Sequence, residues 1–300
     1  MNIGYIGLGS MGGALARRLL LTHPLAVHDP DASAVQRLVA LGAMAVDGPQ
    51  DMAQRCDVIF LCLPTSDHVR TVIFGPHGLA ASARPGTLII DQTSGDPTAT
   101  RAMAAELVPA GIDLIDAPVS GGPRGADAGT IAIMVGADPA LFDRALPLFE
   151  AISPNVFHAG GIGTGHVAKL ANNLLSGGQR LMSLEAMALA VKSGMAPEKA
   201  LEIILASGGR NVFMEKFMGQ HVITGKLKAG FAVGLMHKDV RLACQLGQAV
   251  GMPMLFGNLA KDVYQMAVND MGPDAPVNSV ALTMDRIAGT QVVPSDYSLD

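Results

Sequence analysis

Lys169 and Asn173 are the pair of residues best suited to acid–base chemistry on a bound molecule. They lie four positions apart in the run GTGHVAKLANN (residues 163–173), which has helical character, and residues at that spacing share one face of a helix. A lysine whose pKa is lowered by desolvation or by a nearby positive charge can take a proton from an alcohol and return one to an alkoxide. The amide of Asn173 can orient the same molecule. On spacing alone, a solvated lysine on a helix surface is the alternative.

A second candidate is the run Ser120-Gly121-Gly122, which follows a strand-like segment ending at Asp116. The serine hydroxyl and the unobstructed glycine amides offer hydrogen-bond donors in one concave turn, and such a turn suits a carboxylate. An ordinary tight turn is the alternative. Arg124 comes shortly after, and it either adds a charge to the mouth of this site or faces solvent.

A glycine-rich run at the N-terminus (residues 3–13) suits a dinucleotide. Gly7, Gly9 and Gly12 have the GxGxxG spacing, directly after an apolar strand and directly before a helix. In this pattern Gly7 permits a tight turn, Gly9 lets the backbone approach a diphosphate, and Gly12 lets the helix pack close to the strand. Amides at the start of the helix then face the anion with the positive end of the helix dipole. The amides expected to do so are those of Leu8, Ser10 and Met11. A glycine-rich turn without a ligand is the alternative.

Asp29 ends the second strand-like segment, 17 residues after Gly12. A carboxylate at about that distance accepts hydrogen bonds from the adenosine ribose of NAD and repels the 2′-phosphate of NADP. The next residues are Pro30, Asp31 and Ala32, none of which neutralises a phosphate. The sequence therefore predicts NAD in preference to NADP. The alternative is that Asp29 caps the helix that begins near Ala32.

Two further loops are expected at the same edge of the sheet. Leu63-Pro64 closes the third strand-like segment and the run ending at Ser94 closes the fourth. Open α/β sheets place their ligands outside the carboxyl ends of the strands. We therefore expect these loops to line the nicotinamide side of the cofactor site.

Short β-type runs alternate with amphipathic helical stretches through the first half of the chain. This alternation predicts an α/β fold with a doubly wound, Rossmann-type sheet over residues 1–162. Apolar residues then recur at helical spacing, which predicts an all-helical domain over 163–300, joined to the first by a long helix at 164–193. Gly177-Gly178 within that helix predicts a close backbone approach, such as one across a subunit interface, with a kink as the alternative. The expected strands are 2–6, 25–28, 58–62, 88–91, 113–116 and 131–135, and the expected helices include 11–21, 32–41, 98–110 and 139–152.

Composition excludes several classes of protein. The net charge of -5 and the lack of any Lys or Arg run argue against a nucleic-acid partner. No apolar stretch approaches the roughly 18 residues that indicate a membrane span, and no export signal precedes the first strand, so we expect a cytoplasmic protein. The three cysteines form no CxxC pair and the eight histidines lack ligand spacing, so no metal is predicted. The apolar helices favour a homodimer or homotetramer.

Four motifs occur in the order found in the 3-hydroxyisobutyrate dehydrogenase family, the β-hydroxyacid dehydrogenases that include tartronate semialdehyde reductase. They are the glycine fingerprint, DAPVSGG (116–122), GTGxxxKLxNN (163–173) and Lys238-Asp239. The chain resembles this family over almost its whole length. The resemblance implies an NAD-dependent oxidoreductase that transfers a hydride between its cofactor and a small 3-hydroxy acid or the matching semialdehyde.

The resemblance also implies a role for each matching residue. The run 120–122 binds the substrate, Lys169 is the general acid and base, and Asn173 helps to hold the substrate. Family members that use NADP often carry Asn-Arg where this chain has Asp29-Pro30, which agrees with NAD. The residues matched to positions at or near the cofactor are Leu63, Pro64, Ser94 and Lys238.

Other functions stay open at this point. They are an NAD(P)H-dependent semialdehyde or glyoxylate reductase, an imine reductase on the same scaffold, and a non-catalytic NAD-binding module. Imine reductases and inactive relatives typically replace the lysine at the position of Lys169, which favours a dehydrogenase or reductase. A decarboxylating 6-phosphogluconate dehydrogenase has a longer helical part and needs a basic cluster, and this chain has neither. His166 and His237 lie beside the candidate catalytic positions. An adjacent residue on a helix points about 100° away, so we expect packed or surface side chains at these two histidines.

Overall fold

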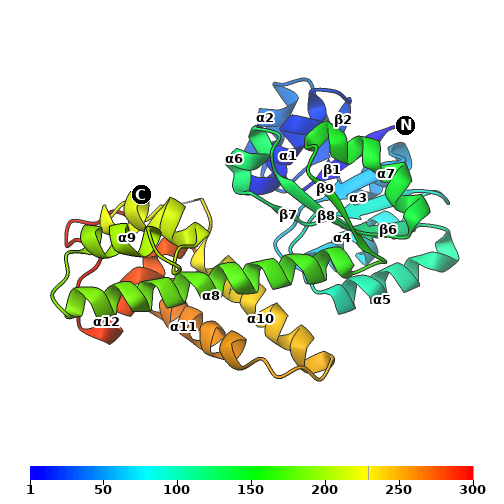
Figure 1. Ribbon diagram of the computed structural model, residues 1–300. Helices are drawn as coiled ribbons and strands as arrows, with labels where there is room; N and C mark the ends of the chain where they lie inside the picture. Colours follow the sequence, from blue (N-terminus) through cyan, green and yellow to red (C-terminus); the bar gives the residue numbers. More distant parts are fainter. Residues whose placement is uncertain (229, 300) are drawn as a thin grey trace. The chain divides into compact units, whose positions relative to one another are not determined.

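The computed structural model describes residues 1–228 and 230–299. The chain divides into two compact units, Met1–Lys169 and Leu170–Asp300. A long helix, α8 (Thr164–Lys192), begins in the first unit and continues into the second, and Figure 1 shows it as one uninterrupted helix. An α/β unit followed by a helical one is the fold class that the sequence predicts, and the structure confirms it.

The first unit contains, within the described residues, a nine-stranded sheet. The strands lie in the order β3-β2-β1-β4-β5-β6-β8-β7, and β9 pairs with β8. From β3 to β6 all pairings are parallel, and the order 3-2-1-4-5-6 is that of dinucleotide-binding sheets. In such sheets the ligand lies where the order reverses, here beside the carboxyl ends of β1 and β4. The strands are β1 (Ile3–Ile6), β2 (Leu25–His28), β3 (Met44–Ala45), β4 (Val58–Leu61), β5 (Leu88–Asp91), β6 (Asp113–Asp116), β7 (Val119–Ser120), β8 (Ala132–Gly136) and β9 (Val156–Gly160).

Helices cover both faces of this sheet (Figure 1). The alternation of side chains along the buried strands supplies two cores: Tyr5 and Phe60 pack into one, Ile6 and Ile59 into the other. Helices α1, α2, α6 and α7 contribute to the first core, and α3, α4 and α5 to the second. The helical elements of this unit are α1 (Ser10–Leu20), α2 (Ala32–Val39), α3 (Pro49–Arg55), α4 (Ser66–Phe74), η1 (Leu79–Ala81), α5 (Pro97–Leu107), η2 (Val108–Ala110), α6 (Gly122–Asp127) and α7 (Pro139–Ile152).

Three strands were not among those expected, namely β3, β7 and β9. Strands β3 and β7 have two residues each, and β9 is largely exposed, so none of them gives a periodic apolar signal. Strand β7 pairs antiparallel with β8, which places Ser120 opposite Ala132. The sheet therefore extends beyond its parallel part, and this extension carries the Ser-Gly-Gly run.

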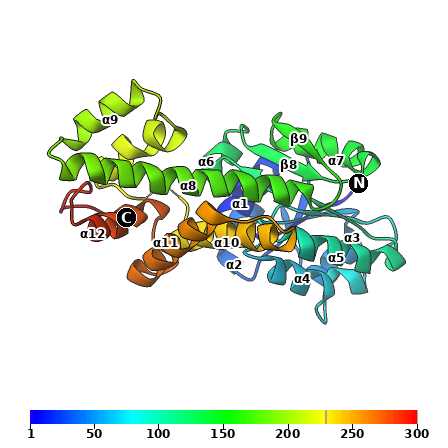
Figure 2. The same cartoon turned by 60° about the horizontal axis from the view of Figure 1, so that its bottom comes forward.

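The second unit is built from helices around one core. Helices α10 and α11 lie side by side in Figure 2 and contact each other extensively. A Cβ on Gly177 of α8 would lie 3.1 Å from Sδ of Met236 and 3.3 Å from the ring of Tyr264, whose hydroxyl donates to the Gly177 carbonyl at 3.1 Å. The close approach at Gly177 is thus to other helices of this chain, whereas Gly178 faces open space. The elements after α8 are α9 (Pro197–Leu205), the π-helix η3 (Met214–Ile223), α10 (Val233–Ala249), α11 (Leu255–Met271), η4 (Val277–Ser279) and α12 (Val280–Ala288).

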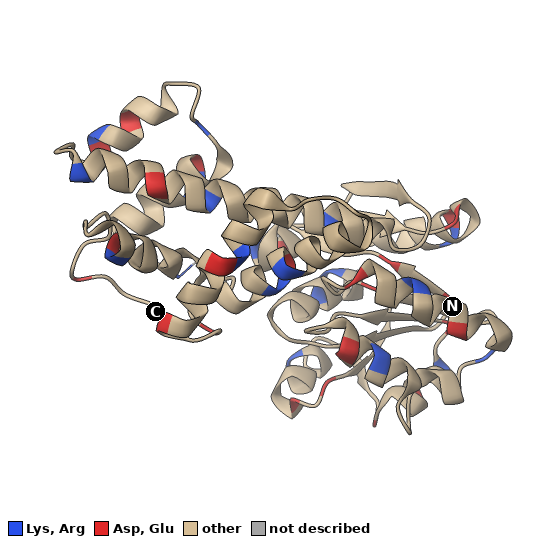
Figure 3. Ribbon diagram, turned by 90° about the horizontal axis from the view of Figure 1, so that it is seen from below, with Lys and Arg blue, Asp and Glu red and all other residues tan. Residues whose placement is uncertain are grey.

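Charged residues of both signs are interspersed along both units (Figure 3). Among the described residues, no helix has the length and apolar character needed to cross a membrane. The same residues contain no group of three or more His, Cys, Asp or Glu side chains arranged to hold a metal ion.

Candidate functional site

The glycine loop after β1 has a different constraint at each glycine. Gly7 adopts a φ of +93°, which favours glycine. A Cβ on Gly12 would lie 1.9 Å from the carbonyl oxygen of Gly7 and 3.0 Å from Cβ of Cys62, so α1 packs directly against the loop. A Cβ on Gly9 would meet no heavy atom of the described residues within 4 Å. Packing therefore requires glycine at 7 and 12 but leaves open space at Gly9, as the approach of a diphosphate requires.

Helix α1 begins at Ser10, and its N-cap, Gly9, supplies no side-chain hydrogen bond. Because the first amides of a helix have no acceptor within it, those of Ser10 and Met11 are available to an anion. The amide of Leu8 instead donates to Oδ2 of Asp29 at 2.6 Å, and its side chain is buried. The expectation that the Leu8 amide faces the anion is therefore wrong, because this amide fastens the loop to the end of β2.

Asp29 has both carboxylate oxygens engaged within the chain. Oδ2 accepts from the amide of Leu8, and Oδ1 accepts from the amide of Asp31 at 2.8 Å. The N-cap of α2 is Asp31, whose side chain accepts from the amide of Ser33 at 2.9 Å, so the alternative that Asp29 caps this helix is wrong. A carboxylate oxygen has two lone pairs, so Asp29 keeps the capacity to accept further hydrogen bonds from a ligand.

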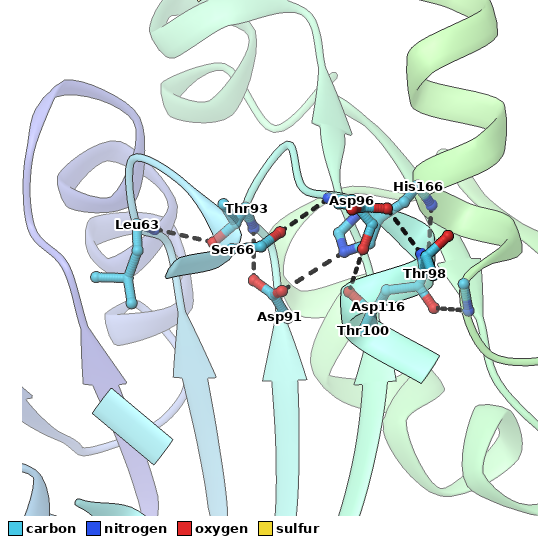
Figure 4. Close-up of polar contacts among 10 residues, drawn as sticks. Leu63, Ser66, Asp91, Thr93, Asp96, Thr98, Thr100, Asp116 and His166 are labelled. Atoms are coloured by element: carbon cyan, nitrogen blue, oxygen red, sulfur yellow. Dashed lines mark hydrogen bonds and ion pairs between the residues drawn. The ribbon is translucent and has the colours of Figure 1, made fainter. Parts of the chain in front are cut away.

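The loops after β4 and β5 emerge beside the glycine loop. Strands β1, β4 and β5 are adjacent and parallel, so their carboxyl ends lie at one edge of the sheet. The amide of Leu63 donates to Oγ1 of Thr93 at 3.1 Å, which ties these two loops together (Figure 4). Pro64 is exposed and Ser94 is half-buried. Three of the predicted cofactor segments therefore meet at this edge.

The Ser-Gly-Gly run joins strand β7 to helix α6. Ser120 ends the strand, and Gly121 and Gly122 have φ values of +141° and +70°, a region that favours glycine. A Cβ on Gly122 would meet no heavy atom of the described residues within 4 Å. The run is thus a strand-to-helix junction with open space beside it. Arg124, on α6, is exposed.

Two buried aspartates and a buried histidine lie where α8 begins (Figure 4). Asp116, the last residue of β6, accepts from the amides of Gly163 at 2.6 Å and His166 at 2.7 Å. Nε2 of His166 lies 3.5 Å from Oδ2 of Asp91, the last residue of β5. The three side chains are 0% exposed. Burial raises the pKa of Asp116 above its ordinary value, although His166 and the two amide donors act in the opposite direction.

Lys169 lies on α8, three residues after His166, and is only 8% exposed. The alternative of a solvated surface lysine is therefore wrong. Burial of an ammonium group is unusual without a partner or a function, because desolvation disfavours the charged form. A lysine shielded from solvent is a candidate for proton transfer.

Asn173 and Lys238 both lie in the helical unit, and the carboxylate of Asp239 contacts both side chains. Nδ2 of Asn173 donates to Oδ2 of Asp239 at 2.5 Å, and Nζ of Lys238 lies 3.1 Å from Oδ1 of the same carboxylate. Asp239 is 1% exposed and Asn173 is 6% exposed. The carboxylate therefore fixes the side-chain amide of Asn173 and balances the charge of Lys238.

Four residues of this arrangement were not assigned a role from the sequence: Asp91, Asp116, His166 and Asp239. Their position in the sequence could have indicated two of them, because Asp91 and Asp116 each end a strand that the sequence predicts. His166 proves to be packed, one of the two outcomes expected for it. Among the residues assigned a role, those from Gly7 to Lys169 lie in the first unit and Asn173 and Lys238 in the second.

Two family models match the chain. One, described as the NAD binding domain of 6-phosphogluconate dehydrogenase, covers residues 2–161. The other, described as NAD-binding of NADP-dependent 3-hydroxyisobutyrate dehydrogenase, covers residues 163–283. Both units of the chain therefore match nicotinamide-dependent dehydrogenases.

Named relatives cover nearly the full length. The chain is 39% identical over 266 residues to 2-(hydroxymethyl)glutarate dehydrogenase of Eubacterium barkeri, with 88% of each chain covered. It is 39% identical over 272 residues to NAD-dependent L-serine dehydrogenase of Pseudomonas aeruginosa, covering 88% of this chain and 91% of the relative. A solved structure of Mycobacterium tuberculosis 3-hydroxyisobutyrate dehydrogenase with L-serine matches with a TM-score of 0.85 and 31% identity, covering 94% of this chain and 98% of that one.

Proposed function

Because the chain belongs to the 3-hydroxyisobutyrate dehydrogenase family, we propose that it interconverts a small 3-hydroxy acid and the matching semialdehyde, with NAD as cofactor and Lys169 as the general acid and base. The observation that carries this proposal is the burial of Lys169, which is 8% exposed on the first turns of α8. Lysine side chains are rarely this buried, and buried ionisable groups cluster at functional sites.

The substrate class follows from the chemistry that the named relatives share. 2-(Hydroxymethyl)glutarate, L-serine and 3-hydroxyisobutyrate all contain a primary alcohol on a carbon next to the one that bears the carboxylate. They differ in the substituent on that middle carbon, which is carboxyethyl, amino or methyl. We therefore assign HOCH2–CH(R)–COO− to this chain as its substrate class, and R is selected by side chains around the site.

The cofactor site proposed here fits the residues present. The open space at Gly9 and the amides of Ser10 and Met11 suit the diphosphate, whereas a Cβ at position 9 would occupy that space. When bound, the nicotinamide accepts a hydride from the alcohol or gives one to the aldehyde. The residues proposed to hold the cofactor are Gly7, Gly9, Ser10, Met11, Gly12, Asp29, Leu63, Pro64, Ser94 and Lys238.

Asp29 supports NAD rather than NADP. Its carboxylate is held at the end of β2 by the amides of Leu8 and Asp31 and cannot turn away without breaking both hydrogen bonds. A fixed negative charge accepts hydrogen bonds from ribose hydroxyls and repels a phosphate in the same place. Charge repulsion therefore selects the cofactor that lacks the 2′-phosphate.

Substrate binding and proton transfer are assigned to different residues of the chain. Ser120 and the amides of Gly121 and Gly122 hold the substrate carboxylate, which fixes the alcohol carbon for reaction. Nζ of neutral Lys169 takes the alcohol proton during oxidation and returns it during reduction. Asn173, one helical turn further along α8, donates to the substrate oxygen while Asp239 fixes its amide.

The test is turnover of a Lys169→Ala variant with a panel of 3-hydroxy acids, followed by absorbance of the reduced cofactor. We expect a loss of about 10²- to 10⁴-fold in kcat, with NAD affinity nearly unchanged. Lys199→Ala is the matched control, because Lys199 pairs with Glu202 on the exposed surface of α9. Retained turnover in Lys169→Ala would remove the lysine from the mechanism.

A pH profile of the wild-type protein gives a second check of the same role. Oxidation needs the lysine neutral, so kcat/KM rises toward alkaline pH. A flat profile between about pH 6 and pH 10, with chemistry rate-limiting, contradicts the assignment.

An exposed apolar stripe on α8 supports a homo-oligomer. Leu175, Met182 and Leu189 repeat every seven residues, so they lie on one face of the helix, and they are 65%, 63% and 70% exposed. Leu255 and Phe256 at the start of α11 are 76% and 81% exposed. A second copy of the chain is the occupant proposed for the α8 stripe, because an exposed apolar face that repeats along a helix is typical of a protein–protein contact.

A further inference from the structure

The first turn of α8 is held by a side chain from the sheet. Asp116 accepts from the amides of Gly163 and His166 at 2.6 and 2.7 Å, although these residues lie 47 and 50 positions away in the chain. Capping residues normally belong to the helix's own N-terminus. Here the acceptor is fixed in β6, so the start of the helix is tied to the edge of the sheet.

The backbone of α8 also approaches the sheet closely at this point. A Cβ on Gly165 would lie 2.3 Å from the carbonyl oxygen of Met134 in β8, and a Cβ on Gly136 would lie 2.8 Å from the amide of Gly165. Neither distance is possible for a real side chain. The first turn of α8 is therefore held in one position against the sheet. Moving this turn requires breaking the contact between Gly165 and β8.

His166 joins the same turn to the cofactor edge. Its Nε2 lies 3.5 Å from Oδ2 of Asp91, and a Cβ on Gly95 would lie 3.1 Å from that nitrogen, so the imidazole packs against the loop that carries Ser94. Nδ1 of His166 has no hydrogen-bond partner among the described residues, although the side chain is completely buried. A buried imidazole with so few hydrogen bonds is costly to the fold, which points to a task beyond stability.

We propose that Asp91, His166 and Asp116 are positioning residues for Lys169, which lies on the same helix three residues after His166. Residues three apart are neighbours on a helix surface, so a rotation or shift of the first turn moves both. The cluster ties the lysine to the ends of β5 and β6 and to the loop of Ser94. This inference rests on the proposed function, because it assigns a purpose to the placement of the general acid and base.

Substitution of His166 by glutamine tests the proposal. Glutamine keeps a polar side chain of similar length but cannot fill the ring's place against Asp91 and the Gly95 backbone. A misplacement of the order of 1 Å costs up to about 10²-fold in rate, so we expect kcat to fall at least 10-fold. The dissociation constant of NAD⁺ should stay within about twofold, and the alkaline rise of the kcat/KM profile should shift on the pH axis, because the lysine's surroundings change.

His158→Gln is the control, at an exposed histidine outside the cluster. His158 lies in the same unit, where its Nε2 contacts the carbonyl of Ala137 at 2.8 Å and its ring stacks on Phe142. Loss of the His158 imidazole should lower the melting temperature without changing kcat or the pH profile of kcat/KM. If His166→Gln behaves like His158→Gln, with lower stability but unchanged kcat and pH profile, the cluster is structural and the proposal is overturned.

A double-mutant comparison separates this inference from the proposed function. In a Lys169→Ala background, His166→Gln should change the residual rate less than about twofold, because a positioning residue has nothing left to position. An equal loss in both backgrounds means that His166 acts independently of the lysine and contradicts the proposal. If Lys169→Ala itself retains turnover, the proposed function fails instead. Should His166→Gln not fold, Asp91→Asn takes its place in every measurement with the same expectations.

Discussion

Replacing Gly9 or Gly12 with alanine adds the same methyl group to one loop. From the structure we expect the change at Gly12 to lower stability and the change at Gly9 to weaken cofactor binding. At Gly12 the new Cβ would lie 1.9 Å from the carbonyl oxygen of Gly7, more than 1 Å inside any contact that real Cβ atoms make. At Gly9 it would meet no heavy atom of the described residues within 4 Å. The φ of Gly9 is -60°, outside the left-handed region that favours glycine.

These distances set the expected magnitudes. Gly12→Ala must push α1 away from the loop, and overpacking of this kind typically destabilises a fold by about 1–3 kcal/mol. Gly9→Ala leaves the free energy of unfolding within about 0.5 kcal/mol of wild type, because the change meets open space. If the diphosphate occupies that space, Gly9→Ala should weaken NAD⁺ binding at least 10-fold, which corresponds to about 1.4 kcal/mol.

The assays are urea unfolding for stability and isothermal titration calorimetry for NAD⁺ affinity. Gly48→Ala serves as the control: a Cβ there also meets no described atom within 4 Å, its φ of 176° is extended, and it lies at the start of α3 rather than in the glycine loop. We expect this variant to match wild type in both assays. Wild-type NAD⁺ affinity in Gly9→Ala would refute the placement of the diphosphate, and wild-type stability in Gly12→Ala would refute the packing argument.

Three further predictions concern cofactor selection by Asp29, the exposed stripe of α8 and the buried thiol of Cys56. Asp29→Asn removes a fixed charge, so the ratio of kcat/KM for NADP⁺ to that for NAD⁺ should rise about 10-fold or more; an unchanged ratio removes Asp29 from cofactor selection. Met182→Glu places a charge in the exposed stripe of α8 and should lower the oligomeric state measured by light scattering, whereas an unaltered mass would show that this face is not an interface. Burial raises the pKa of the Cys56 thiol to about 11, so iodoacetamide at pH 8 should alkylate it in urea but scarcely in the folded protein, with peptide mass mapping as the readout and equal rates as the contrary result.

Much of the fold could be predicted because its elements follow local patterns. The largely apolar runs that became β1, β2, β4 and β5 give a strong signal, since parallel strands buried on both faces are nearly continuous apolar segments. Strands of two residues, such as the one carrying Ser120, give none, because a period of two cannot be seen in two residues. The structure places Gly177 against helices of its own chain. The residues next to Gly177 in the sequence could not show whether its close approach is to the same chain or to another subunit.

By itself the sequence determined the features that depend on backbone geometry over a few residues. The glycine spacing from Gly7 to Gly12, the helical pairing of Lys169 with Asn173 and the acid at Asp29 can all be read without coordinates, because turns, helices and strands each impose a fixed local period. The tertiary structure alone decided that Lys169 is buried and that Asp116 caps a helix that begins some 50 positions later. Such contacts depend on how the edge of a sheet packs against a helix. They join residues far apart in the sequence, and a local sequence pattern does not show which distant residues meet.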